Sequence, residues 1–119
     1  MKVLRLLPLL LLSLAGCQHP QNRPGGYSAV AASTSEVLTA AQFAVTAQEV
    51  VMKAEPGSEP VQLTLVQIQS AHQQVVAGTN YKMQLKVSVN GTVKQAEALV
   101  WYQSWRTPDP YQLTHWSWK

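Results

Sequence analysis

The clearest alternation of apolar and polar positions lies between residues 81 and 89. Tyrosine, methionine, leucine and valine occupy the odd positions, and lysine, glutamine and serine occupy the even ones. This two-residue period predicts a β-strand with one face buried and the other in water. Asn90-Gly91 follows directly, and this pair favours a tight two-residue turn. We therefore expect residues 92–103 to return as the antiparallel partner strand.

The other strands are predicted from β-branched and aromatic residues bounded by turn residues. Residues 61–76 form the longest such segment, and their alternation changes phase at Leu65-Val66. One extra residue reverses the faces of a strand, so we expect a β-bulge there. Residues 104–110 contain two prolines and predict a loop before a last strand over residues 111–118. A short first strand is expected over residues 27–31.

One helix is predicted over residues 33–53. Ser33 and Glu36 have the spacing of a capping box, and the prolines and glycine of residues 54–60 end the helix. The polar positions form one narrow stripe, which comprises Thr39, Gln42, Thr46, Glu49 and Lys53. Apolar side chains occupy the rest of the circumference, so the helix needs a cover that curves around it. The chain therefore predicts an α+β domain: one long helix packed on a curved antiparallel sheet of four to five strands.

The first seventeen residues have the pattern of an export signal. Lys2 and Arg5 precede an apolar run that is too short to span a bilayer as a mature helix. A buried core helix is the alternative, but Pro8 and the lack of a polar face weigh against it. The segment ends in Leu-Ala-Gly-Cys and resembles the lipobox of bacterial lipoproteins, which implies that Cys17 is lipidated. A chance cysteine in an ordinary secreted protein is the alternative.

We therefore predict a signal peptide over residues 1–16, a lipidated cysteine and tether over residues 17–26, and a folded domain over residues 27–119. A glutamine after the cysteine of such a lipoprotein implies sorting to the outer membrane of a bacterial cell envelope. The tether reaches at most about 30 Å. Cys17 is the single cysteine, so the domain has no internal disulfide.

Charge and residue spacing point away from several function classes. Without the leader, the chain has seven Lys and Arg residues against six Asp and Glu residues, which is a net charge of +1. The basic residues are also spread along the sequence, and no cluster of them indicates nucleic acid binding. The three histidines lack metal-ligand spacing, and no cofactor is expected. His115 and Asp109 are residue types found in catalytic triads, but no nucleophile has supporting context, so we do not expect an enzyme.

Two turns should lie at the same end of the sheet, because successive hairpins alternate ends. One is Ala77-Gly78, which follows the apolar pair Val75-Val76, and the other is the loop with Trp105 and Arg106. Turns usually carry polar residues. Aromatic and arginine side chains are frequent anchors of protein interfaces. The two turns together therefore suggest a binding edge, although turn and core-strand roles for the valines and the glycine remain the alternative.

The residues of this edge resemble the cystatins, inhibitors of papain-like cysteine proteases. Gln74 to Gly78 reads QVVAG, the central cystatin motif. Gly25-Gly26 matches the family's N-terminal glycine pair, and AAQFAV at 40–45 resembles the LARFAV helix motif of plant cystatins. EALVWYQSW at 97–105 resembles the strand before the second loop, except that Ser104 replaces a proline.

The resemblance implies a wedge that plugs the cleft of a papain-like protease reversibly and sterically. The residues that it implies for protease binding are Gly25, Gly26, Gln74, Val75, Val76, Ala77, Gly78 and Trp105. The partners are then the protease and, through the lipid on Cys17, a membrane, with the protein itself a monomer. The alternative is a non-inhibitory lipoprotein of cystatin fold that serves as an interaction module of the envelope, since fold alone does not fix function.

Overall fold

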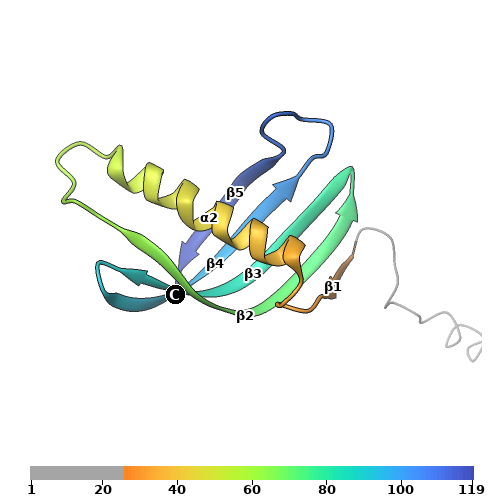
Figure 1. The fold of residues 1–119 in the computed structure, drawn as a ribbon, viewed down its shortest axis with the longest axis horizontal. Helices are drawn as coiled ribbons and strands as arrows, with labels where there is room; N and C mark the ends of the chain where they lie inside the picture. Colours follow the sequence, from red (N-terminus) through yellow and green to blue (C-terminus); the bar gives the residue numbers. More distant parts are fainter. Residues whose placement is uncertain (1–25) are drawn as a thin grey trace, which may run out of the picture.

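The computed structural model describes residues 26–119, which form one antiparallel sheet and one helix. The elements are β1 (Tyr27–Ala29), α2 (Ser35–Lys53), β2 (Leu63–Val76), β3 (Gly78–Val89), β4 (Thr92–Tyr102) and β5 (Tyr111–Trp118). The strands lie in the order β1-β2-β3-β4-β5, and α2 crosses one face of the sheet (Figure 1). The expected α+β class, with a helix on a curved antiparallel sheet, is confirmed.

The β3–β4 hairpin has the register that Asn90-Gly91 predicts. Val89 pairs with Thr92, and the ladder runs without interruption to the pair of Thr79 and Tyr102. Asn90 and Gly91 have φ values of 52° and 94°, and a two-residue hairpin of type I′ requires positive φ at both of these positions. This central hairpin fixes which side chains face the helix.

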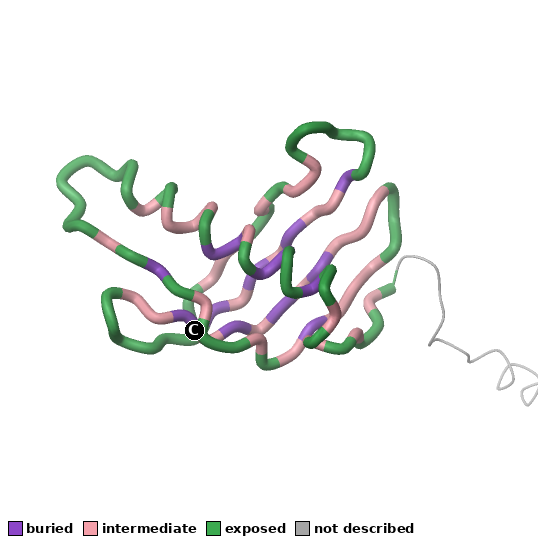
Figure 2. Tube along the Cα trace, viewed as in Figure 1, coloured by how far each residue is buried: buried purple, intermediate pink, exposed green. Residues whose placement is uncertain are grey.

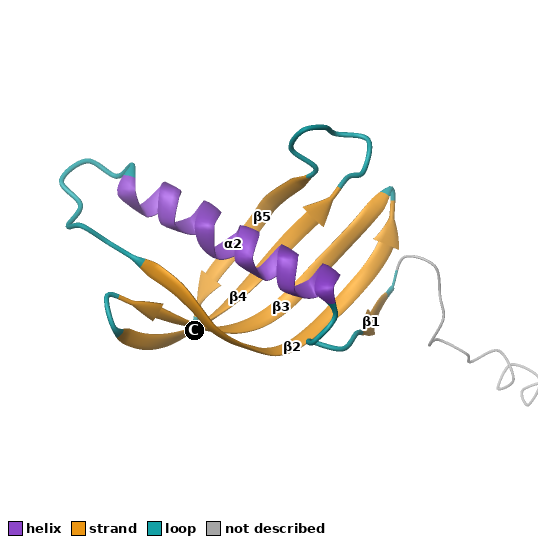
Figure 3. Ribbon diagram, viewed as in Figure 1, coloured by secondary structure: helices purple, strands orange, loops and turns teal. Residues whose placement is uncertain are grey.

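Strand β2 bends around the helix at two irregularities in its pairing with β3. One lies between Leu65 and Gln67, where the bulge was predicted, and a second lies between Ile68 and Ser70, where none was expected. Each extra residue restores the inward face, so Leu65, Ile68 and Ala71 all pack toward the core at a spacing of three. Figure 3 shows the resulting curvature beneath α2.

The helix begins one residue later than the capping-box spacing indicated. Thr34, not Ser33, is the N-cap: its Oγ1 accepts the Val37 N–H at 3.4 Å and donates to the Ala31 carbonyl at 3.1 Å. Both residues are good cap types. Sequence spacing alone therefore does not decide between them.

The core lies between one side of α2 and the inner face of the sheet (Figure 2). The helix contributes mainly small residues, and the sheet contributes larger ones; the fully buried members include Ala40, Ala41, Ala44, Met83, Leu85, Val87 and Val100. Small helix residues let the helix approach the sheet closely. The expectation that the sheet covers the whole apolar arc is wrong, because Leu38, Val50 and Val51 are exposed. The sheet curves around one side of the helix only.

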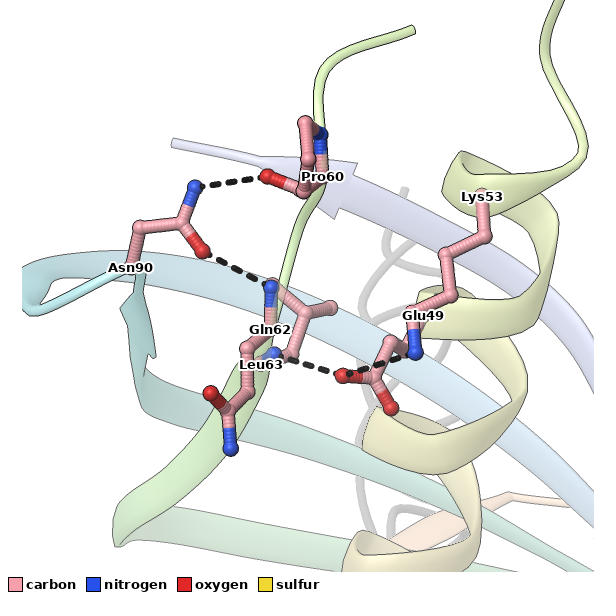
Figure 4. Close-up of polar contacts among 6 residues, drawn as sticks. All are labelled: Glu49, Lys53, Pro60, Gln62, Leu63 and Asn90. Atoms are coloured by element: carbon pink, nitrogen blue, oxygen red, sulfur yellow. Dashed lines mark hydrogen bonds and ion pairs between the residues drawn. The ribbon is translucent and has the colours of Figure 1, made fainter.

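Polar contacts close the end of the domain that carries the Asn90 turn (Figure 4). The Asn90 Oδ1 accepts the Gln62 N–H at 2.8 Å, and its Nδ2 donates to the Pro60 carbonyl at 3.1 Å. The Glu49 carboxylate accepts the Leu63 N–H at 3.0 Å. These bonds join the start of β2 to the hairpin on one side and to the helix on the other.

Candidate functional site

Two turns project at the end of the sheet opposite Asn90, at the upper right of Figure 1. One joins β2 to β3 and the other joins β4 to β5, as the alternation of hairpins predicts. We define the apical ridge as the residues Val75, Val76, Ala77, Gly78 and Trp105 at this end. Val75 is 66% exposed, Val76 42% and Trp105 57%. Large apolar side chains at this exposure form a surface suited to binding another protein.

The β2–β3 turn is unusually tight. Val76 pairs with Gly78, so Ala77 alone forms the apex. Gly78 has a φ of 86°, and a Cβ atom there would overlap the Tyr102 carbonyl oxygen. Glycine is needed for both reasons, because other residues rarely adopt this φ and none could approach β4 so closely. Replacing Gly78 with a bulky residue would therefore displace the whole turn.

The β4–β5 loop holds Trp105 outward through bonds beneath it. Gln103 is buried, and its N–H donates to the Pro110 carbonyl at 2.7 Å, which closes the loop. The Arg106 N–H donates to the Gln103 carbonyl at 2.9 Å, and the Arg106 guanidinium donates to Gln112 at 3.3 Å. These bonds make a compact turn in which Trp105 projects from a fixed backbone. The Thr107–Pro108 peptide bond in the same loop is cis.

The two turns touch each other through tryptophans. The ring of Trp105 meets the ring of Trp101 edge to face, with centroids 6.4 Å apart. The Trp101 Nε1–H donates to the Ala77 carbonyl at 2.8 Å. Trp101 is not among the binding residues that were expected from the sequence. The two-residue turn at Asn90-Gly91 fixes the register of β3 and β4, and this register pairs Trp101 with Asn80, close to the β2–β3 turn. The sequence could therefore have placed Trp101 beside the site.

The N-terminal strand lies beside the ridge. Tyr27 pairs with Gln74, which brings Gly26 close to the β2–β3 turn, and Gly26 is exposed. Gln74 is half-buried and accepts a hydrogen bond from Asn80 at 2.9 Å, so it braces the base of the turn more than it adds to the exposed edge. Gly25 and Cys17 lie outside the described residues.

The ridge offers apolar surface rather than reactive groups. Its exposed atoms are valine methyls, an indole ring and backbone, with a guanidinium from Arg106 alongside.

The neighbouring part of the sheet contains a charged contact. The Lys82 Nζ lies 4.6 Å from the centroid of the Tyr27 ring. Burial of Tyr27, together with the nearby Glu97 carboxylate, raises the pKa of the Tyr27 hydroxyl. Residues 26–119 contain no cluster of three metal-ligating side chains and no helix long and apolar enough to cross a bilayer. The exposed apolar side chains of the ridge are suited to binding by shape and burial.

Sequence comparison places this protein in a family. The sequence model of the cystatin domain matches residues 25–113, and the chain belongs to the cystatin family. Comparison with curated protein sequences finds no match.

Solved structures show the same fold. Human cystatin F, solved as a dimer, is 14% identical with a TM-score of 0.65; the match covers 87% of this chain and 95% of that one. A salivary cystatin of the soft tick Ornithodoros moubata is 20% identical with a TM-score of 0.60, over 82% of this chain and 99% of that one. The structure of Al-CPI is 21% identical with a TM-score of 0.59, over 80% and 100% respectively.

Proposed function

We propose that this protein is a reversible, steric inhibitor of papain-like cysteine proteases. The observation that carries the proposal is the apical ridge: residues 75–78 and Trp105, far apart in the sequence, converge into one exposed apolar edge on a cystatin fold. Such an edge fits a long enzyme cleft. The central turn enters the cleft, the indole of Trp105 packs on one side, and the segment around Gly25 and Gly26 lies on the other.

The geometry of the turn explains how a protease would bind the ridge without cleaving it. The pairs Val76–Gly78 and Val75–Thr79 keep the chain in a closed hairpin up to the apex. A protease needs an extended strand with a free carbonyl laid against its nucleophile. The Ala77 carbonyl is instead turned back and hydrogen-bonded to Trp101. The enzyme is therefore blocked by bulk, and dissociation returns both proteins intact.

We propose further that the domain acts as a monomer held at a bacterial envelope. The support is the leader and the Leu-Ala-Gly-Cys sequence, which imply lipid on Cys17 and, through the following glutamine, sorting to the outer membrane. The described chain begins beside the ridge, since Tyr27 pairs with Gln74. A tether from Cys17 would therefore hold the ridge end close to the bilayer. Incorporation of radiolabelled palmitate tests the anchor, and Cys17→Ala should abolish it.

Papain titration tests the inhibition. Residues 18–119, without leader or lipid, should reduce papain activity at one inhibitor per enzyme, and activity should return on dilution. The recovered inhibitor should be intact by mass spectrometry, and a serine protease such as trypsin should be unaffected. A folded domain that leaves papain fully active at micromolar concentration would contradict the proposal and favour a non-inhibitory binding module.

A further inference from the structure

We propose that Trp101 is a positioning residue that locks the two turns of the apical ridge together before any protease binds. The inference rests on the proposed function, because it concerns how the ridge is prepared for the cleft. Its basis is one side chain with two partners: the apex of the β2–β3 turn and the ring of Trp105.

The first partner is the carbonyl of Ala77. Ala77 is the unpaired apex between Val76 and Gly78, so its carbonyl has no partner in the strand ladder. The indole N–H of Trp101 donates to it at 2.8 Å, a short distance for this kind of bond. A tight turn with a free apex could tilt to either side of the sheet. The bond draws the apex of this turn toward the face on which Trp101 lies.

That face is the one opposite the helix. Val100, next to Trp101, is fully buried in the core, and successive residues of a strand point to opposite faces. Trp101 is half-buried and does not belong to the hydrophobic core between sheet and helix. Its removal should therefore leave the packing of that core in place, which separates a positioning role from a stabilising one.

The second partner couples the turn to the neighbouring loop. The rings of Trp101 and Trp105 meet at 77° with centroids 6.4 Å apart, a favourable edge-to-face geometry. A Cβ built on Gly78 would lie 3.0 Å from the Trp101 Nε1 and 3.3 Å from the Trp105 Cη2. The indole of Trp101 thus stands where turn and loop meet, and movement of either one disturbs the same ring.

A ridge held in this way meets its partner already ordered. Side chains and loops that are already fixed in the free protein lose less entropy on binding, so an ordered ridge binds more tightly than a flexible one. The indole N–H is the part of Trp101 that phenylalanine cannot supply. Losing the bond while keeping a ring should release the turn and weaken binding about tenfold, within the usual range for one hydrogen bond.

The test compares Trp101→Phe with Trp118→Phe in the chain from residue 18. Trp118 also pairs edge to face with a tryptophan, Trp116, but at the opposite end of β5. Amide hydrogen exchange is measured for the ridge and for the core strands, together with papain association and dissociation rates. For Trp101→Phe we expect exchange at Ala77 and Gly78 to quicken at least several-fold, unchanged exchange at Met83, and an inhibition constant raised about tenfold. Trp118→Phe should change neither the ridge exchange nor the inhibition constant.

Two results would overturn the proposal. One is unchanged exchange at the ridge in Trp101→Phe, which would show that the bond does not hold the turn. The other is faster ridge exchange with an unchanged inhibition constant, which would show that the order is irrelevant to binding. If the unmodified protein itself fails to inhibit papain, the proposed function falls, and the exchange data alone then decide whether Trp101 locks the turns.

Discussion

Truncation of Trp105 to alanine should weaken protease binding more than truncation of either valine of the apical ridge. The side chain projects from a loop whose backbone is fixed by Gln103 and Arg106. It is the largest exposed side chain of the ridge, and it packs on the surface of Trp101 without entering the core. Its replacement therefore removes contact area while the fold remains.

The expected loss of binding free energy follows from the exposed area of the Trp105 side chain. Trp105 is 57% exposed, and aromatic side chains of its class present roughly 150–250 Å². A partner can then cover roughly 85–140 Å², which at ~25 cal/mol per Å² is about 2–3.5 kcal/mol. Because ordering and desolvation consume part of this gain, we expect a loss near the lower figure, about 30-fold in the inhibition constant. Val75→Ala removes much less area, and we expect about fivefold.

The assay is papain inhibition by the two ridge variants and by a matched control for each. Trp118→Ala and Val93→Ala remove exposed side chains of the same types near the other end of the domain. Circular dichroism and the midpoint of thermal unfolding confirm that each variant is folded. The reasoning is refuted if Trp105→Ala inhibits as well as the unmodified protein, or if the control variants lose as much inhibition as the ridge variants.

The other predictions concern stability. Met83→Ala should lower the free energy of unfolding by about 2–5 kcal/mol in urea titrations, since Met83 is fully buried; a smaller loss would mean that the core collapses around the gap. Asn90→Gly keeps the turn backbone and the bond from the backbone N–H at position 90 to the Gln62 carbonyl, but it removes the two side-chain bonds to the Gln62 N–H and the Pro60 carbonyl. The free energy of unfolding should therefore fall by about 1–3 kcal/mol, and no loss would show that water replaces the two bonds. Burial, reinforced by neighbouring charges, raises the pKa of Tyr81 and Tyr111 above 10.0. The unfolded chain therefore loses these protons first, and stability that is full below pH 10 should fall as pH rises further; urea midpoints should show this, and Tyr81→Phe should flatten the fall.

The fold was predictable where a local signal also fixed the long-range pairing. Asn90-Gly91 determines its own turn and, by counting, the register of both flanking strands. The strict alternation of residues 81–89 then assigns the buried face. The second irregularity in β2 was missed because Gln69, Ser70 and Ala71 are polar or small and mark a buried face only weakly. The exposure of Val50 and Val51 was missed because the extent of the sheet is a tertiary property.

The candidate site was only partly visible in the sequence. QVVAG and Trp105 could each be recognised because the residues of each motif are contiguous in the chain. Trp101 could not be assigned a role from its own neighbours, because its partner, Ala77, lies 24 residues away across two strands. The need for glycine at position 78 likewise has two causes. The positive φ could be expected from a turn, but the contact with the Tyr102 carbonyl required the folded chain.

The central claim is that the apical ridge, and no other part of the domain, enters the protease cleft. Amide hydrogen exchange of the domain in complex with papain tests this most directly. We expect slower exchange on binding at Val75 to Gly78 and at residues 104–106, with the Asn90 turn unchanged. Protection at the Asn90 end, or on the exposed side of the helix around Val50, would contradict the account.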